Sequence, residues 1–70
     1  MRVLVPLADG LEELEAVTIR DVLRRGGIET VGAALGESLQ VQGSRGVKLL
    51  ADAVWDNLDL ESFDALVLPG

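Results

Sequence analysis

Glu15 is the residue whose type and spacing most strongly indicate chemistry in this sequence. On a helical wheel of about 100° per residue, Glu15 falls near the centre of an apolar stripe. The stripe is formed by Leu11, Leu14, Ile19, Val22 and Leu23. Burying an unpaired carboxylate costs on the order of several kcal/mol, so we expect Glu15 to be paired, protonated or used in a reaction. A structural carboxylate held by a backbone group or an arginine fits the spacing equally well.

Two further positions could bind or stabilise an anion. Arg45 lies in the "GSRG" turn, where a glycine-flanked guanidinium is well held and always charged. A solvated surface charge is the alternative interpretation. The segment "DALVLPG" closes at Gly70, where an exposed backbone N–H could contact an oxyanion. Arg24 and Arg25 are most simply explained as cations that favour the carboxyl-terminal end of a helix.

The composition limits the chemistry that these residues can perform. The chain has 70 residues, a net charge of −6, and neither cysteine nor histidine. Disulfides, thiolate catalysis and the usual zinc ligands are therefore excluded within it, and we expect no metal site. The negative charge opposes binding to nucleic acid or to an anionic membrane. Apolar runs such as residues 3–8 are too short to span a bilayer, and no signal peptide precedes them, so we expect a cytoplasmic protein.

The hydrophobic pattern predicts a strand, a helix and a second strand in succession, which is a βαβ unit. Residues 2–8, "RVLVPLA", form a continuous apolar run, as expected for a parallel strand covered on both faces. A helix from Leu11 to about Arg25 has glutamates in its first turn and arginines in its last, and Gly26-Gly27 end it. The later elements are a strand at 28–35, two short strands around a turn within 39–51, a polar connection with room for one helical turn at 52–63, and a last strand at 64–70.

The predicted elements leave one face of the sheet uncovered. A parallel sheet needs helices on both faces, and one long helix covers only one. We therefore expect residues 1–70 to be the amino-terminal portion of a single larger α/β domain, or to work with a second chain. A self-sufficient domain is the less favoured alternative, because a core of this size is marginal.

The loop after the first strand argues against two familiar kinds of site. A nucleotide-binding loop would be rich in glycine and free of acid, whereas "ADGLEELE" places three glutamates there. An acidic phosphorylation pocket would use Asp9, but it would also need an acceptor aspartate at the end of a central strand. "DALVLPG" ends in Pro-Gly instead, so both sites remain weaker alternatives.

Four segments in register resemble the ThiJ/PfpI family over nearly the whole chain, from Arg2 to Gly70. They are "VLVPLADGLEELEAV", "RDVLRRGGIE", "GSRGVKLLADA" and "FDALVLPG". The chain looks most similar to the Parkinsonism-associated deglycase-like branch, and "SRGVKLLADA" to its bacterial YajL-like members. The resemblance implies a flavodoxin-like α/β sandwich with a mostly parallel sheet, of the class I glutamine-amidotransferase-like type, which would be incomplete in this chain.

The same resemblance implies roles for particular residues. In the family, a glutamate of the first helix hydrogen-bonds a cysteine on a strand-to-helix turn, and Glu15 occupies that position. Arginines matching Arg45 and, from a partner subunit, Arg25 border the pocket as an anion-attracting pair, and Gly70 lies near the oxyanion site. The chain departs from the family pattern in three respects. The catalytic cysteine of relatives lies well beyond Gly70, and the second glycine of the family's "PGG" is absent. Gly43 stands where many relatives have a further cysteine.

We therefore expect the amino-terminal part of a cysteine enzyme of the stress response that needs no cofactor. Its substrates would be small reactive carbonyls or glycated compounds, transformed by deglycase or glyoxalase-like chemistry, and it would act as a homodimer. Three alternatives remain open: an intracellular cysteine peptidase of the PfpI type, a holdase-type chaperone, and a non-catalytic remnant that only dimerises.

Overall fold

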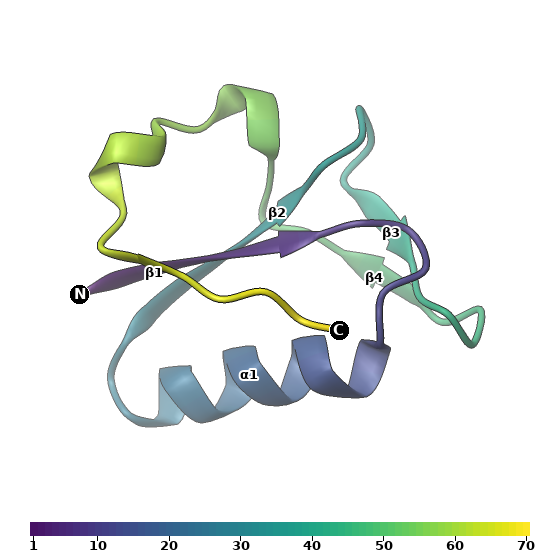
Figure 1. The fold of residues 1–70 in the computed structure, drawn as a ribbon, viewed down its shortest axis with the longest axis horizontal. Coiled ribbons are helices and arrows are strands. Elements are labelled where there is room, and N and C mark those ends of the chain that lie inside the picture. The colour runs from purple at the N-terminus through teal and green to yellow at the C-terminus, as the bar shows by residue number, and fades with distance from the viewer.

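The computed structural model of the chain describes residues 1–70 and contains one α-helix and two sheets (Figure 1). The elements, in chain order, are β1 (Arg2–Leu7), α1 (Glu13–Arg25), β2 (Glu29–Ala34), β3 (Gln40–Gln42), β4 (Lys48–Leu50), β5 (Ala53–Val54), two 3₁₀ turns (Trp55–Asn57 and Leu60–Ser62) and β6 (Ala65–Leu66). The predicted βαβ unit is therefore confirmed, with boundaries that shift by one or two residues.

The main sheet has the strand order β5-β2-β1-β6, and every neighbouring pair is parallel. β1 and β2 pair along their full lengths, from Arg2 beside Glu29 to Leu7 beside Ala34. β3 and β4 form a separate antiparallel hairpin. The prediction of an α/β fold with a mostly parallel sheet is confirmed. The carboxyl ends of its strands lie at one edge, where ligand sites form in open α/β sheets.

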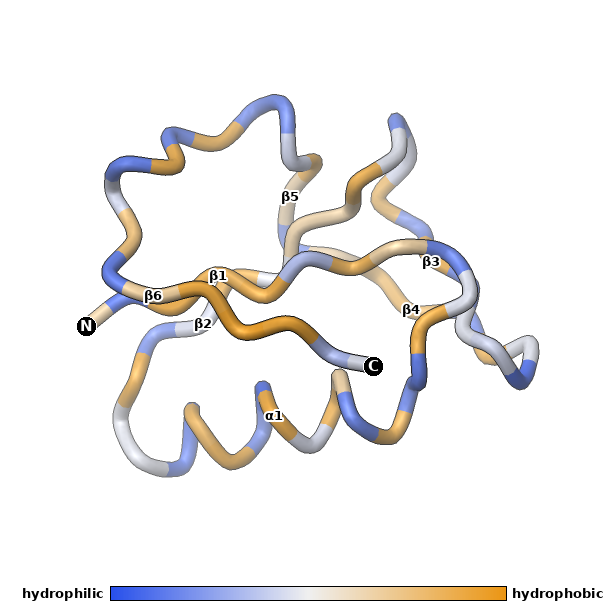
Figure 2. The backbone as a smooth tube through the Cα atoms, viewed as in Figure 1, coloured by the Kyte–Doolittle hydropathy of each residue, from blue (hydrophilic) through white to orange (hydrophobic).

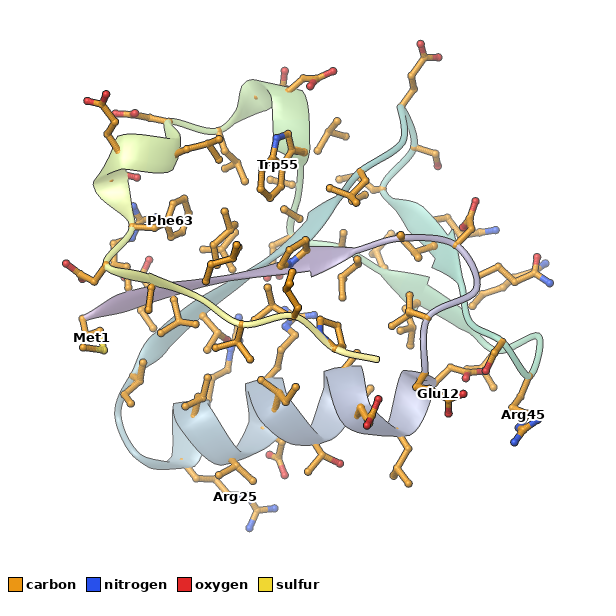
Figure 3. All side chains as sticks on the ribbon, in the orientation of Figure 1. Met1, Glu12, Arg25, Arg45, Trp55 and Phe63 are labelled. Carbon is orange, nitrogen blue, oxygen red and sulfur yellow. The ribbon has the colours of Figure 1, made fainter.

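The central strand β1 is buried on both faces, which explains its continuous apolar sequence. One face joins the core cluster on the helix side of the sheet, whose buried members include Val3, Val5, Leu7, Leu11 and Ala16. On the other face, Leu4 lines a hollow of about 390 Å³ together with Trp55 and Phe63 (Figure 3).

The connection between β5 and β6 covers part of the face opposite α1 (Figure 1). The sequence predicted a polar connection with room for one helical turn, and the structure differs in two respects. The segment makes two 3₁₀ turns, and the short strand β5 precedes it, paired with the end of β2. The apolar side chains of Trp55, Leu60 and Phe63 line the hollow between the connection and the sheet.

α1 begins at Glu13, two residues later than predicted. Residues 8–11 form a turn instead, in which the Leu11 N–H donates to the Ala8 carbonyl (3.2 Å), and Glu12 has extended backbone geometry. The predicted carboxyl end is confirmed. The residue after the helix cap, Gly27, has a left-handed backbone with φ of 80°, a conformation that glycine adopts without strain.

Several large apolar side chains are exposed to solvent, among them Leu14, Val17, Val22, Leu50, Leu66 and Leu68. Figure 2 shows the hydrophobic stretch that continues from β6 along the edge of the sheet toward the carboxyl end of the chain. The single α-helix lacks the length and apolar character needed to cross a bilayer.

We predict that residues 1–70 in isolation do not unfold cooperatively. Only 15 of the 70 residues are buried, so little apolar area is removed from water to offset the loss of conformational entropy. Thermal unfolding of the isolated peptide, followed by circular dichroism, should be broad, and an apolar dye should bind the exposed face. A sharp two-state transition of the monomeric peptide would contradict this prediction.

Candidate functional site

The candidate site lies where the segment after β6 meets the first turns of α1. Beyond Val67, whose N–H donates to the Leu4 carbonyl (3.0 Å), the chain runs beside α1 toward the amino-terminal end of that helix (Figure 1). A pocket of about 400 Å³ lies between the two segments and is lined by Leu14, Glu15, Thr18, Ile19, Leu68, Pro69 and Gly70. The pocket is therefore outside the carboxyl end of a parallel strand, the usual place for a site in this kind of sheet.

Glu15 and Gly70, both predicted from the sequence, are in direct contact beside this pocket. The Gly70 N–H donates to Oε2 of Glu15 (2.9 Å), and the Gly70 carbonyl accepts the Glu12 N–H (2.8 Å). A Cβ atom at position 70 would overlap the Glu15 carboxylate, so a larger residue there would displace the Glu15 side chain. The contact joins two residues that lie 55 positions apart in the sequence.

The prediction that Glu15 lies in the buried stripe of the helix is wrong. Glu15 is exposed, and so are Leu14 (78%) and Val22 (59%), which belong to the same predicted stripe. The buried face of the helix carries Glu13 and Ala16, which lie about 160° and about 100° from Glu15 around the helix axis. A helical wheel gives the angles between side chains but not the direction of the sheet. The predicted stripe therefore combined apolar residues from two faces of the helix.

The buried carboxylate of α1 is Glu13, which the sequence analysis did not single out. Glu13 is 9% exposed and reaches the turn between β3 and β4. Its carboxylate accepts the Arg45 N–H (2.9 Å), the Val47 N–H (3.4 Å) and the Ser44 hydroxyl (3.2 Å). The sequence signal for the burial of Glu13 was its three-residue spacing from Ala16, because helical residues three apart share a face.

Hydrogen bonds make Glu13 a stronger acid. Its own backbone N–H, followed by those of Arg45 and Val47 and by the Ser44 hydroxyl, lowers the pKa of the Glu13 carboxyl below its ordinary value, while burial opposes the effect. Glu13 is therefore ionised at neutral pH and holds the hairpin turn as a carboxylate.

Arg45 lies at the tip of the β3–β4 hairpin, beyond the amino-terminal end of α1 (Figure 3). It is exposed, and its guanidinium makes neither a hydrogen bond nor an ion pair. The other arginines each pair with a carboxylate; they are Arg2, Arg20, Arg24 and Arg25. The Arg45 guanidinium is thus available to an anion, and anion binding there stays a prediction.

Arg25 is the last residue of α1, at the end of the helix opposite to the Arg45 turn (Figure 3). At about 1.5 Å per residue, it lies roughly 15 Å along the helix from Glu15. Its guanidinium pairs with Asp21 one turn earlier (3.1 Å), as an exposed helix pair does. Its role through a partner subunit stays a prediction.

The arrangement supplies an acid–base group and a pocket. A carboxylate fixed by a backbone N–H can exchange a proton with a reacting group placed within hydrogen-bond reach. No cysteine or histidine is available in the chain as a nucleophile or second base. The structure shows no cluster of three or more side chains suited to holding a metal ion.

Comparison with known proteins relates the chain to one family. The DJ-1/PfpI family model matches residues 1–70. Protein DJ-1 homolog B of Arabidopsis thaliana is 55% identical over 69 residues, which make up 99% of this chain and 16% of that protein. A deglycase of Thermococcus kodakarensis is 36% identical over 70 residues, which make up 100% of this chain and 42% of that protein. The chain therefore spans less than half the length of either relative.

The structural comparison supports the same relationship. Oxidized DJ-1 of Toxoplasma gondii superimposes with a TM-score of 0.94 at 43% sequence identity, over 99% of this chain and 38% of that one. The predicted flavodoxin-like α/β fold is confirmed by this likeness and by the parallel sheet.

We predict that Glu13 makes the stability of the full-length protein depend on pH. Its pKa is lowered on folding from 4.5, so its stabilising effect is present above that pH and is lost as the pH falls through the lower folded-state value. Glu13→Gln should therefore lower the free energy of unfolding near neutral pH, and the difference from wild type should shrink below about pH 4.5. Urea denaturation at a series of pH values measures this difference.

The matched control for this experiment is Glu37→Gln. Glu37 is exposed, so the same change of charge should alter stability little at any pH. A difference between Glu13→Gln and wild type that stays constant over the acid range would contradict the prediction.

Proposed function

The chain belongs to the DJ-1/PfpI family, and we propose that it forms the amino-terminal part of a cysteine-dependent enzyme that acts on reactive carbonyls, as a deglycase does. The observation that carries the proposal is the contact between Glu15 and Gly70. This contact fixes an acid–base group beside a pocket at the carboxyl end of a parallel strand. A relative named a deglycase supports the choice of chemistry. The proposed reaction uses no cofactor.

The geometry of Glu15 suits proton transfer. Its Oε2 accepts the Gly70 N–H, whereas its Oε1 has no hydrogen-bond partner and remains free for a reacting group. The exposed position beside the pocket gives a substrate access to that oxygen. Gly70 thus holds the carboxylate in place through one oxygen, while the other oxygen is free to accept a proton.

The nucleophile would be a cysteine outside residues 1–70, because the chain contains none. Glu15 would first take the thiol proton. The thiolate would then add to the carbonyl carbon, forming a C–S bond, and the electron pair of the C=O π bond would move to oxygen. That oxygen would take the proton back from Glu15, which leaves a hemithioacetal and a carboxylate. The sequence of steps requires Glu15 within hydrogen-bond reach of both the sulfur and the oxygen.

Arg45 would attract substrates that carry a carboxylate beside the carbonyl. Its guanidinium is unpaired and flanks the end of α1 that carries Glu15. In a homodimer, Arg25 of the partner subunit would add a second cation. Exposed apolar side chains of α1 support an association of this kind; they are Leu14, Val17 and Val22.

We predict that Glu15 is required for turnover but not for folding. Glu15→Gln keeps an oxygen that can accept the Gly70 N–H and removes the carboxylate that takes up and returns the proton, so kcat for methylglyoxal should fall by about 10²-fold or more with little change in melting temperature. Glu15→Leu removes both the acceptor and the acid and should cause a similar loss. Turnover and thermal unfolding, measured on the same preparations of full-length protein, separate the two effects.

Glu12→Gln is the matched control for the Glu15 variants. Glu12 precedes the same helical turn and is exposed, and its carboxylate contacts only the Ser44 hydroxyl (3.3 Å). We expect turnover close to wild type in this variant. Unchanged turnover in a folded Glu15→Leu protein would falsify the catalytic role of Glu15, and activity that follows only the folded fraction would make it a structural carboxylate.

We predict that Arg45→Ala weakens anionic substrates selectively. Loss of a charge-assisted hydrogen bond should raise KM for glyoxylate about tenfold or more, with a smaller change for the neutral methylglyoxal. Lys48→Ala is the control, because Lys48 is the other cation of the chain without a carboxylate partner. Equal effects of Arg45→Ala on both substrates would identify Arg45 as a solvated charge.

A further inference from the structure

We propose that Glu13 is a positioning residue for Arg45: it fixes the turn that presents the guanidinium to an anionic carbonyl substrate. The inference rests on the anion-binding role of Arg45 in the proposed function. It assigns a task to a buried carboxylate that the proposed reaction does not otherwise use.

Both oxygens of Glu13 are bound to the turn that carries Arg45. Oε2 accepts the backbone N–H groups of Arg45 (2.9 Å) and Val47 (3.4 Å), and Oε1 accepts the Ser44 hydroxyl (3.2 Å). Hydrogen bonds to an ionised carboxylate are roughly twice as strong as neutral ones. The backbone anchored in this way includes that of Arg45 itself.

Gly43 provides the space for this anchor. It is buried, and a Cβ atom at this position would overlap the Glu13 carboxylate. The turn closes around it, since the Gly43 N–H donates to the Val47 carbonyl (2.8 Å) and its carbonyl accepts the Gly46 N–H (3.0 Å). A side chain at position 43 must therefore displace the carboxylate of Glu13, which offers a way to move the anchor without deleting it.

The same hairpin is tied to the segment that leads into α1. The Ser44 N–H donates to the Leu11 carbonyl (2.8 Å), and the Gly10 N–H donates to the Gln42 carbonyl (2.8 Å). The Gln42 N–H in turn donates to the Asp9 carboxylate (2.9 Å). The Arg45 turn and the first turn of α1 therefore form one hydrogen-bonded unit, and that helical turn carries the proposed catalytic carboxylate.

The Arg45 backbone is fixed while its guanidinium is free. Ordering the backbone before a ligand arrives reduces the conformational entropy lost on binding, so affinity for an anion increases without an added contact. Removing Glu13 should therefore weaken the binding of anionic substrates and leave the chemical step nearly unchanged.

The test uses full-length protein and two independent measurements. Glu13→Ala deletes the carboxylate, Glu13→Gln keeps one acceptor oxygen, and Gly43→Ala displaces the carboxylate while retaining its charge. Glu37→Ala is the matched control, because Glu37 is exposed and makes no hydrogen bond. For each variant, amide hydrogen exchange is measured at Arg45 and Val47, and KM and kcat are measured for glyoxylate and methylglyoxal.

We expect exchange at Arg45 and Val47 to become about tenfold faster or more in Glu13→Ala, less so in Glu13→Gln, and to stay unchanged in Glu37→Ala. KM for glyoxylate should rise several-fold relative to that for methylglyoxal, with little change in either kcat. Gly43→Ala should reproduce both effects. Adding Glu13→Ala to Arg45→Ala should cause no further loss of preference for glyoxylate, because both changes act through one guanidinium.

Several outcomes would overturn the positioning role. One is equal weakening of both substrates, with an unchanged ratio of the two KM values, which a merely structural Glu13 would produce. Another is exchange at Arg45 and Val47 that is no faster in Glu13→Ala than in Glu37→Ala. If Glu13→Ala does not fold, Glu13→Gln and Gly43→Ala decide by the same criteria.

The outcomes also distinguish this inference from the proposed function. If Arg45→Ala changes the KM ratio and Glu13→Ala does not, the anion-binding role of Arg45 stands and the positioning role of Glu13 is wrong. If neither variant changes the ratio, the anion-binding role is wrong as well, and the positioning role is overturned with it.

Discussion

The hydrogen-bonding needs of the first turn of α1 are the constraint on which the candidate site depends. The amino terminus of a helix leaves backbone N–H groups without partners inside the helix, and other segments must satisfy them. The Gly70 carbonyl satisfies one of these groups by accepting the Glu12 N–H (2.8 Å). This hydrogen bond holds the segment after β6 against the helix. The pocket lies between these two segments.

Two carboxylates of this turn have different roles because of their positions on the helix. Glu13 and Glu15 are two residues apart, so their side chains point in directions about 160° apart around the helix axis. Glu13 is buried against the β3–β4 turn, whereas Glu15 is exposed beside the pocket and contacts Gly70. The helix dipole favours a negative charge at both positions, so a single electrostatic preference supports a structural anchor and a candidate catalytic group.

The arginines also have two kinds of role, because some pair with carboxylates in the fold and one is free to bind an anion. Arg20 and Arg24 both pair with Asp52, whose carboxylate also accepts the Gly32 N–H (2.8 Å), and these contacts connect α1 to the sheet. Arg45 makes no such pair, although the chain carries a net charge of −6. An unpaired cation on an acidic chain gives anions one local point of attraction, and the fixed backbone of its turn defines where that point lies.

The sequence by itself determined the βαβ unit, the helix end at Gly26-Gly27 and the family, because apolar runs, glycine signals and contiguous motifs are local. It also singled out Glu15 and Gly70, which the fold joins. Only the tertiary structure decided that Glu13 is the buried carboxylate, since helical periodicity fixes relative angles but not the side on which the sheet packs. It likewise decided the two-residue strand β5, which depends on pairing with β2 and has no periodic pattern of its own.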